Sequence, residues 1–221
     1  MCTYDVYKIL NENFGLKCLS ERRLKLSRVN ELNDPFELRP YDISCPNRRR
    51  VFLETRDDMH SNMGLVCFSS GWSNPVIWAH YSDNHKGLCL GLEIQTEEVA
   101  NNECEKVRYI KKTLPFPIDY SNLPDRARHK IVQRILFTKY EHWKYENEIR
   151  LWGSLQNEEN GLYFFNFGRN LQVREVIVGA KCTLSRQEIA RAIGPLTSSV
   201  EIIKTRAAHD QFKMVRDEDW E

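Results

Sequence analysis

Short strand patterns alternate irregularly with a few helix patterns along this chain, and this order limits its possible folds more than any other feature. Apolar runs with β-branched and aromatic residues predict buried strands at residues 64–69 and 88–94. The patterns do not follow the regular strand–helix–strand order of a doubly wound parallel sheet. We therefore predict an α+β fold, with a mixed or antiparallel sheet flanked by a few helices.

Weaker patterns place the remaining elements. Further strands are expected at residues 24–29, 107–110, 148–155, 162–167, 173–178 and 200–205. Helices are expected at residues 74–82, 125–141 and 185–193, and another follows a basic loop at 47–50 and runs to about residue 61. Residues 6–14 have helix-like spacing, although Val6 and Tyr7 fit the start of a strand equally well.

Nothing in the composition divides the 221 residues into separate units. The chain has no internal repeat, no low-complexity segment and no linker rich in Gly, Ser or Pro. We therefore expect a single domain over residues 1–221. Its core is expected at about residues 5–205, followed by a polar tail at residues 206–221.

Positive and negative side chains nearly balance. Lys and Arg number 32 and Asp and Glu number 31, so the net charge is 32 − 31 = +1. This balance excludes a highly basic nucleic-acid coat protein but leaves room for a local basic patch. No apolar run approaches the roughly 20 residues that span a bilayer, and the first residues lack the features of a signal peptide. We therefore expect no membrane partner.

The seven cysteines indicate a reducing compartment. Their number is odd, their spacing is wide, and no two form a C-x-x-C pair. Several lie in apolar runs, where Cys behaves as a small hydrophobe. We expect reduced thiols in a cytoplasmic protein, with paired disulfides or one reactive thiol as the alternatives. The cysteines are Cys2, Cys18, Cys45, Cys67, Cys89, Cys104 and Cys182.

Residues 67–87 concentrate polar and aromatic side chains between two predicted strands. The segment holds two Trp, two His, one Tyr and four Ser. Aromatic rings beside hydroxyl groups suit a flat ligand such as nicotinamide or a nucleobase. The alternative is that Trp78 and Tyr81 only pack the short helix on the sheet. His80 and His85 are five residues apart and do not share a helix face, so we expect no metal site.

Glu146 and Glu148 form a second candidate group. Their i, i+2 spacing would place both carboxylates on one face of a strand. Like charges on one face raise the pKa of one group unless a cation or a substrate lies between them. One carboxylate would then orient a substrate hydroxyl while the other stabilises developing positive charge. The alternative is a solvated strand end, with Lys144 and Arg150 as counter-ions.

Clustered basic residues form a third candidate group, led by Arg48, Arg49 and Arg50. Arg clusters interleaved with aromatic residues can bind nucleic-acid phosphates. The alternative is ordinary solvated surface, because acidic residues follow each cluster and the net charge is close to zero. The glycine-rich fingerprints of nucleotide-binding loops do not occur in the sequence.

Three blocks, in order, resemble a widespread bacterial family of domains of unknown function. The blocks are the turn Leu-Asn-Asp-Pro-Phe-Glu at residues 32–37, the segment 67–87 with its Trp-Ala-His-Tyr and His-Lys-Gly motifs, and Trp-Lys-Tyr-Glu-Asn-Glu-Ile-Arg at residues 143–150. The resemblance extends from about residue 5 to residue 180. It implies a family but no reaction.

The layout is also similar, more loosely, to that of ADP-ribosyltransferases. The strand end at residues 68–70 ahead of the 74–82 helix resembles their middle element, and Glu146-x-Glu148 resembles their E-x-E-like motif. The resemblance implies a split mixed sheet that binds NAD as a substrate. It further implies that Glu148 holds the nicotinamide ribose 2′-hydroxyl and stabilises an oxocarbenium-like transition state, while Glu146 positions the acceptor.

The same resemblance implies further NAD contacts from the first strand, the middle strand and the short helix. The implied residues are Tyr81 or Trp78 stacked on the nicotinamide, His80 or Ser69 at the ribose, and Lys8 or Tyr7 in the first-strand position.

We therefore expect an ADP-ribosyltransferase-like enzyme that uses NAD to modify a nucleic-acid or protein acceptor, as a toxin or an antiphage-defence effector. This hypothesis is preferred because it uses both the 67–87 segment and the glutamate pair. A non-catalytic nucleic-acid-binding or nucleotide-binding module is the alternative. A metal-dependent nuclease or other hydrolase is a third hypothesis.

Overall fold

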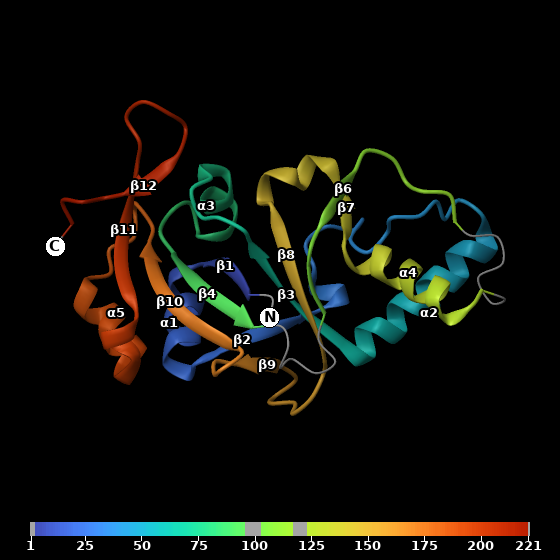
Figure 1. Cartoon of the computed structure of the whole chain (residues 1–221), viewed down its shortest axis with the longest axis horizontal. Helices are drawn as coiled ribbons and strands as arrows, with labels where there is room; N and C mark the ends of the chain where they lie inside the picture. Colours follow the sequence, from blue (N-terminus) through green and yellow to red (C-terminus); the bar gives the residue numbers. More distant parts are fainter. Residues whose placement is uncertain (1–2, 96–102, 117–122, 221) are drawn as a thin grey trace.

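Strands and helices follow one another in irregular order in the computed structural model, which describes residues 3–95, 103–116 and 123–220 (Figure 1). The strands are β1 (Thr3–Leu10), β2 (Arg23–Arg28), β3 (Met63–Ser69), β4 (Leu88–Gln95), β5 (Glu103–Lys106), β6 (Arg108–Ile110), β7 (Thr138–Tyr140), β8 (Glu148–Ser154), β9 (Tyr163–Asn166), β10 (Leu171–Val178), β11 (Glu201–Ala207) and β12 (Met214–Arg216). The helices are α1 (Glu12–Glu21), α2 (Pro46–Asn62), α3 (Pro75–Tyr81), α4 (Asp125–Leu136) and α5 (Arg186–Ile193), with 3₁₀ turns η1 (Val29–Glu31), η3 (Glu141–Glu146) and η4 (Gly194–Ser199).

One mixed sheet forms the centre of the molecule. Within the described residues it has ten strands, and its main path runs β12-β11-β10-β4-β1-β3-β2-β9. β8 pairs with β3, and β5 pairs with β8. β10 and β11 run parallel, and β6 and β7 form a separate parallel pair. The predicted α+β class, with a mixed sheet and flanking helices, is confirmed.

The sheet is split between β1 and β2. β8 pairs with β3 along its whole length, so β1 and β2 both lie at the other edge of β3. β1 reaches that edge only where Tyr7 lies opposite Ser69, and β2 only where Ser27 and Arg28 lie opposite the first part of β3. Residues 66–68 of β3 therefore face a gap between the two strands.

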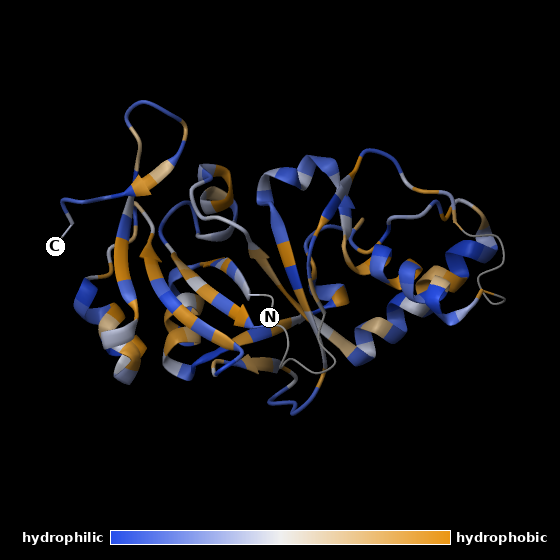
Figure 2. Ribbon diagram, in the orientation of Figure 1, coloured by the Kyte–Doolittle hydropathy of each residue, from blue (hydrophilic) through white to orange (hydrophobic). Residues whose placement is uncertain are grey.

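Apolar side chains bury the sheet on both faces, as β4 illustrates. Leu88, Leu90 and Leu92 pack in a cluster that includes Leu19 of α1 and residues of α5. The intervening Cys89 points to the opposite face, where it packs in the cluster around α3. Figure 2 shows apolar residues along much of the central strands, while the helices mix polar and apolar residues.

A second cluster joins α2 and α4 to the β3–β8 side of the sheet. Met59 of α2 and Ile131 and Ile135 of α4 pack with Leu65 and Trp152. These two helices lie together at one end of the molecule, and α5 and the C-terminus lie at the other (Figure 1).

Two local expectations are corrected, and one that left a helix and a strand open is settled. The helix expected at residues 125–141 ends at Leu136, because the β-branched and aromatic residues that follow pair with β6 as strand β7. Residues 6–10 belong to strand β1, since they pair with β4 along their length. Arg48 to Arg50 lie within α2 and not in a loop, because a proline opens that helix earlier. Strands β5 and β12 were not expected.

Two further observations concern the thiols and the helices. The cysteines within the described residues are all free, and Cys2 lies outside them. None of the described helices is both long and apolar enough to cross a membrane.

Candidate functional site

A buried group of ionised side chains lies beside the gap in the sheet. Lys139 of β7 is at its centre, with its ammonium 2.6 Å from Oε2 of Glu146, 3.0 Å from Oε1 of Glu37 and 3.2 Å from Oε2 of Glu148. All four residues are buried. The ammonium thus holds together three carboxylates from two separate segments of the chain.

Arg150 completes this ionic cluster from within β8. Its Nε donates to Oε1 of Glu148 at 2.8 Å, and its Nη2 donates to Oε2 of Glu37 at 2.7 Å. Its Nη1 donates to the carbonyl oxygen of Leu136, the last residue of α4, at 3.0 Å. The guanidinium is fully buried, so its charge is balanced by these carboxylates and not by water.

The two glutamates do not lie on one strand, which corrects that expectation. Glu148 is the first residue of β8, whereas Glu146 ends the turn η3. Asn147 between them has left-handed backbone angles, φ 46° and ψ 53°, and redirects the chain. Both carboxylates nevertheless meet, because each is drawn to the Lys139 ammonium.

The segment 67–87 and the segment 142–150 meet at this point. Ser69 Oγ donates to the carbonyl oxygen of Glu146 at 2.7 Å, and the Tyr81 hydroxyl donates to Oε1 of the same residue. Asn74 caps α3 through its Oδ1, while its Nδ2 donates to the carbonyl oxygen of Tyr145 at 3.0 Å. These bonds fix α3, and with it Tyr81, against η3.

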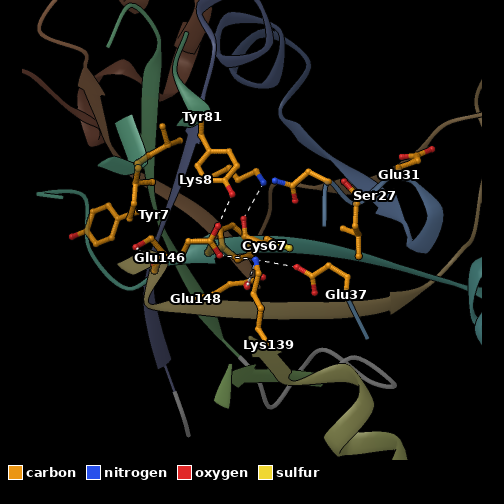
Figure 3. A pocket seen from close by; sticks show the side chains of 16 residues that line it. Tyr7, Lys8, Ser27, Glu31, Glu37, Cys67, Tyr81, Lys139, Glu146 and Glu148 are labelled. Carbon is orange, nitrogen blue, oxygen red and sulfur yellow. Dashed lines mark hydrogen bonds and ion pairs between the residues drawn. The ribbon is translucent and has the colours of Figure 1, made fainter. Parts of the chain in front are cut away.

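A cavity of about 240 Å³ opens at the gap between β1 and β2 (Figure 3). Lys8 reaches into the gap, and its Nζ donates to the carbonyl oxygen of Cys67 at 2.9 Å, where a neighbouring strand would otherwise bind. The lining residues are Tyr7, Lys8, Ile9, Ser27, Glu31, Leu32, Asn33, Glu37, Cys67, Phe68, Ser69, Ile77, Tyr81, Lys139, Glu146 and Glu148.

The pKa values of the two glutamates are shifted in opposite directions. Burial would raise the pKa of Glu148, but the Arg150 guanidinium and the Lys139 ammonium lower it to about 2. Burial raises the pKa of Glu146, and in that case Lys139 and the Tyr81 hydroxyl only partly offset the effect. Glu148 is therefore a fixed anion, whereas Glu146 is the carboxylate that can take up and release a proton.

Six of the residues expected at the site line this cavity, and five do not. Trp78 is fully buried in the core, where its Nε1 donates to the carbonyl oxygen of Trp72 at 2.6 Å. His80 is exposed and lies 2.9 Å from the Tyr145 hydroxyl. The six that line it are Tyr7, Lys8, Ser69, Tyr81, Glu146 and Glu148, and the other three that do not are Arg48, Arg49 and Arg50.

Tyr7 lines the cavity with its ring but directs its hydroxyl elsewhere (Figure 3). It lies next to Gly91 of β4, which in turn lies next to Glu175 of β10. Because Gly91 has no side chain, Glu175 can lie over it and interact with Tyr7. Burial and this carboxylate raise the pKa of Tyr7 to about 12.

Two central residues, Glu37 and Lys139, were not predicted. Glu37 ends the quoted turn block at residues 32–37, where Asp34 Oδ1 accepts from the amide of Phe36 at 2.9 Å and shapes the turn. That block was a usable signal for Glu37. Lys139 gave none, because it lay within a pattern that favoured a helix.

The central part of the chain matches a known family model. Residues 77–151 match the family described as "Protein of unknown function (DUF2971)". This match confirms the expected resemblance to a family of domains of unknown function. The DUF2971 segment runs from α3 into β8, so it contains Tyr81, Lys139, Glu146, Glu148 and Arg150. No curated protein and no solved structure matches the chain.

The side chains that line the first cavity offer charged and hydrogen-bonding groups to a ligand. In the part of the chain that the structure describes, no group of three or more His, Cys, Asp or Glu side chains is arranged to hold a metal ion. The carboxylates that converge are already bound to Lys139 and Arg150. The groups open to a small ligand are the remaining carboxylate lone pairs, the Tyr81 hydroxyl and the Lys8 ammonium.

Proposed function

We propose that this protein is an ADP-ribosyltransferase-like enzyme that cleaves NAD in the cavity between β1 and β2 and transfers ADP-ribose to a nucleic-acid or protein acceptor. The observation that carries the proposal is the pair Glu146 and Glu148, which line one cavity with pKa values moved apart. Two carboxylates in such different environments suit a reaction through an oxocarbenium-like transition state.

The charge of the ionic cluster supports a cationic substrate. When all its members are ionised, it contains three carboxylates and two cations, so it carries 3 − 2 = 1 net negative charge. The nicotinamide ring of NAD is positively charged while it is attached to ribose, and the ribose becomes positive as the ring leaves. A fixed anion beside the reacting carbon stabilises that charge more strongly in the transition state than in the ground state.

Each group has a defined part in the proposed step. The bond between ribose C1′ and the nicotinamide nitrogen breaks, and its electron pair leaves with neutral nicotinamide. The acceptor then forms a bond to C1′ and loses a proton, which Glu146 takes up because its pKa is raised. Glu148 stays ionised and holds Lys139 and Arg150 in place.

Lys8 supplies a further cation in the lining of the cavity. Its ammonium makes one hydrogen bond in the gap, to the carbonyl oxygen of Cys67, and can donate others. The NAD diphosphate is the matching anion, so Lys8 would orient the dinucleotide with its nicotinamide end toward the carboxylates. Lys8→Met should then weaken NAD binding while leaving the ionic cluster unchanged.

Release of nicotinamide from NAD tests the proposal directly. The wild-type protein should release it in the presence of DNA, RNA or cell lysate, and Glu146→Gln should reduce the rate by about 10²–10³-fold. Glu141→Gln is the matched control, since Glu141 lies in the same turn η3 but outside the cavity. No release under any of these conditions, from folded protein, would contradict the proposal.

A nucleotide-binding module without catalysis is a second candidate. It is favoured by one observation, the number of hydrogen bonds that Glu148 already accepts, which come from Nε and Nη2 of Arg150 and from Lys139. Such a module would show an NAD-induced rise in melting temperature, lost in Lys8→Met, with no nicotinamide release.

A further inference from the structure

A second cavity, of about 250 Å³, shares Lys139 with the first but has a different chemistry. Two of its aromatic side chains are unusually exposed, Phe36 at 61% and Tyr140 at 44%. Three cations line it in addition to Lys139, namely Arg39, Lys111 and Lys112. Exposed aromatic rings beside several cations are a combination that attracts ring-shaped anions.

The fold brings these residues together from three segments. β6 and β7 pair so that Ile110 lies beside Tyr140, which places the following lysines at the mouth of the cavity. The amide of Leu114 donates to the carbonyl oxygen of Pro40 at 2.7 Å, which ties the turn carrying Phe36 to the same place. The cavity therefore has walls of defined geometry.

The cations of this cavity are open to an anion. Arg39 lies over the Phe36 ring, with its guanidinium carbon 5.4 Å from the ring centre, and its buried Nε has no hydrogen-bond partner in the described part of the chain. Lys111 is 80% exposed and its ammonium lies 3.9 Å from Glu141, a weak pair. The Lys139 ammonium, by contrast, is bound to the carboxylates of the first cavity.

We propose that this second cavity binds one nucleotide unit, with the base stacked on Phe36 or Tyr140 and the phosphate held by Arg39, Lys111 and Lys112. The volume of about 250 Å³ is enough for one ring system. The site does not depend on catalysis in the first cavity, so it is tested by a separate binding measurement.

The same chemistry is present in a free mononucleotide and in a single-stranded nucleic acid. Fluorescence anisotropy with a labelled thymidine oligomer of about 12 nucleotides, without NAD, measures binding of a single strand. Unlabelled thymidine monophosphate, added as a competitor, measures binding of a free mononucleotide. Displacement at similar concentrations of the two assigns the site to a free nucleotide, and displacement only by unlabelled strand assigns it to a single strand.

Variants locate the binding. Phe36→Ala should weaken binding at least about fivefold, because stacking on each base contributes about 1–3 kcal/mol. Lys111→Gln with Lys112→Gln should also weaken binding. The slope of the logarithm of the binding constant against the logarithm of the salt concentration should become shallower by about one per lysine. Arg48→Gln with Arg50→Gln is the matched control, since these arginines of α2 lie outside the cavity.

Two results would overturn the assignment. One is absence of binding to both probes by protein with a normal melting curve. The other is wild-type affinity in the Phe36 and lysine variants with a loss in the arginine control, which would move the site to α2. Glu146→Gln should bind the oligomer normally, so failure of the NAD reaction and failure of this site give different results.

Discussion

At the scale of single residues, Lys139 and Arg150 determine the state of the site. Each is buried, and each bridges carboxylates that would otherwise repel one another. Removing one partner of a buried ion pair leaves the other partner's charge buried and uncompensated. The resulting loss of folding free energy is far larger than the net contribution of the intact pair. The two cations are therefore needed for the fold as well as for the charge of the cavity.

Lys139→Met tests this requirement. Loss of the ammonium removes the ion pair of Glu146 and leaves Glu37 and Glu148 paired with Arg150 alone in the described structure. The free energy of unfolding should therefore fall by about 3–5 kcal/mol. Urea denaturation measures the change. Lys144→Met, at an exposed position five residues later, should change it by less than about 0.5 kcal/mol. Equal effects of the two substitutions would show that burial of the ammonium does not matter.

The pH dependence of stability follows from the pKa of Glu148. Its pKa is about 2 in the folded protein, below its usual value of 4.5, so its contribution is complete above pH 4.5 and is lost as the pH falls toward 2. The free energy of unfolding, measured between about pH 2 and pH 5, should therefore decrease toward acid. Glu148→Gln should reduce that slope, and an unchanged slope would contradict the assignment.

Glu146 should act in the opposite sense. Its pKa is raised above the usual 4.5, so its contribution is present below that value and is lost as the pH rises through the raised pKa. Glu146→Gln should remove the loss of stability that occurs as the pH rises toward neutral. It should leave the loss of stability toward acid pH unchanged. Thermal melts from about pH 4 to pH 7 separate the two glutamates.

At the scale of elements, the position of Tyr81 depends on how α3 is anchored. Asn74 both caps the helix and binds η3, so Asn74→Ala should cost about 1–2 kcal/mol and displace the Tyr81 hydroxyl from Glu146. Ser185→Ala, which removes a cap of α5 far from the cavity, should cost about as much stability. Only the Asn74 variant should lower nicotinamide release or NAD binding.

Elements with a strong local pattern could be predicted from the sequence. Strands β3 and β4 follow apolar runs, and α5 follows a capping box in which Ser185 accepts from the amide of Glu188. The helical spacing of α4 continued through its end, so β7 was missed. A three-residue strand is stabilised by its partner β6, and that partner is distant in sequence.

The site was predictable only in part for the same reason. Glu146, Glu148 and Tyr81 lie in segments of unusual composition, which mark them as candidate site residues. Lys139 has no such signal, because a lysine at the end of a helical pattern normally faces solvent. Its burial results from carboxylates contributed by two other segments.

At the scale of the whole molecule, Gly87 marks a point where three turns of the chain meet. A Cβ there would lie 1.9 Å from the carbonyl oxygen of Leu10 and 2.8 Å from Cα of Asn11, and the amide of Gly179 donates to the Gly87 carbonyl. Gly87→Ala should therefore destabilise the protein by about 3 kcal/mol. Gly71→Ala meets no atom within 4 Å and should melt like the wild type. Differential scanning calorimetry compares the two.

The single residue pair between β1 and β3 has a consequence for backbone protection. Tyr7 opposite Ser69 is the only ladder contact between these strands in the described sheet, whereas β1 pairs with β4 and β3 with β8 along whole strands. The backbone at this junction is therefore held by fewer hydrogen bonds than the strands on either side of it. Amide hydrogens next to this pair should exchange with solvent faster than those at the middle of β4, and a bound dinucleotide should slow them.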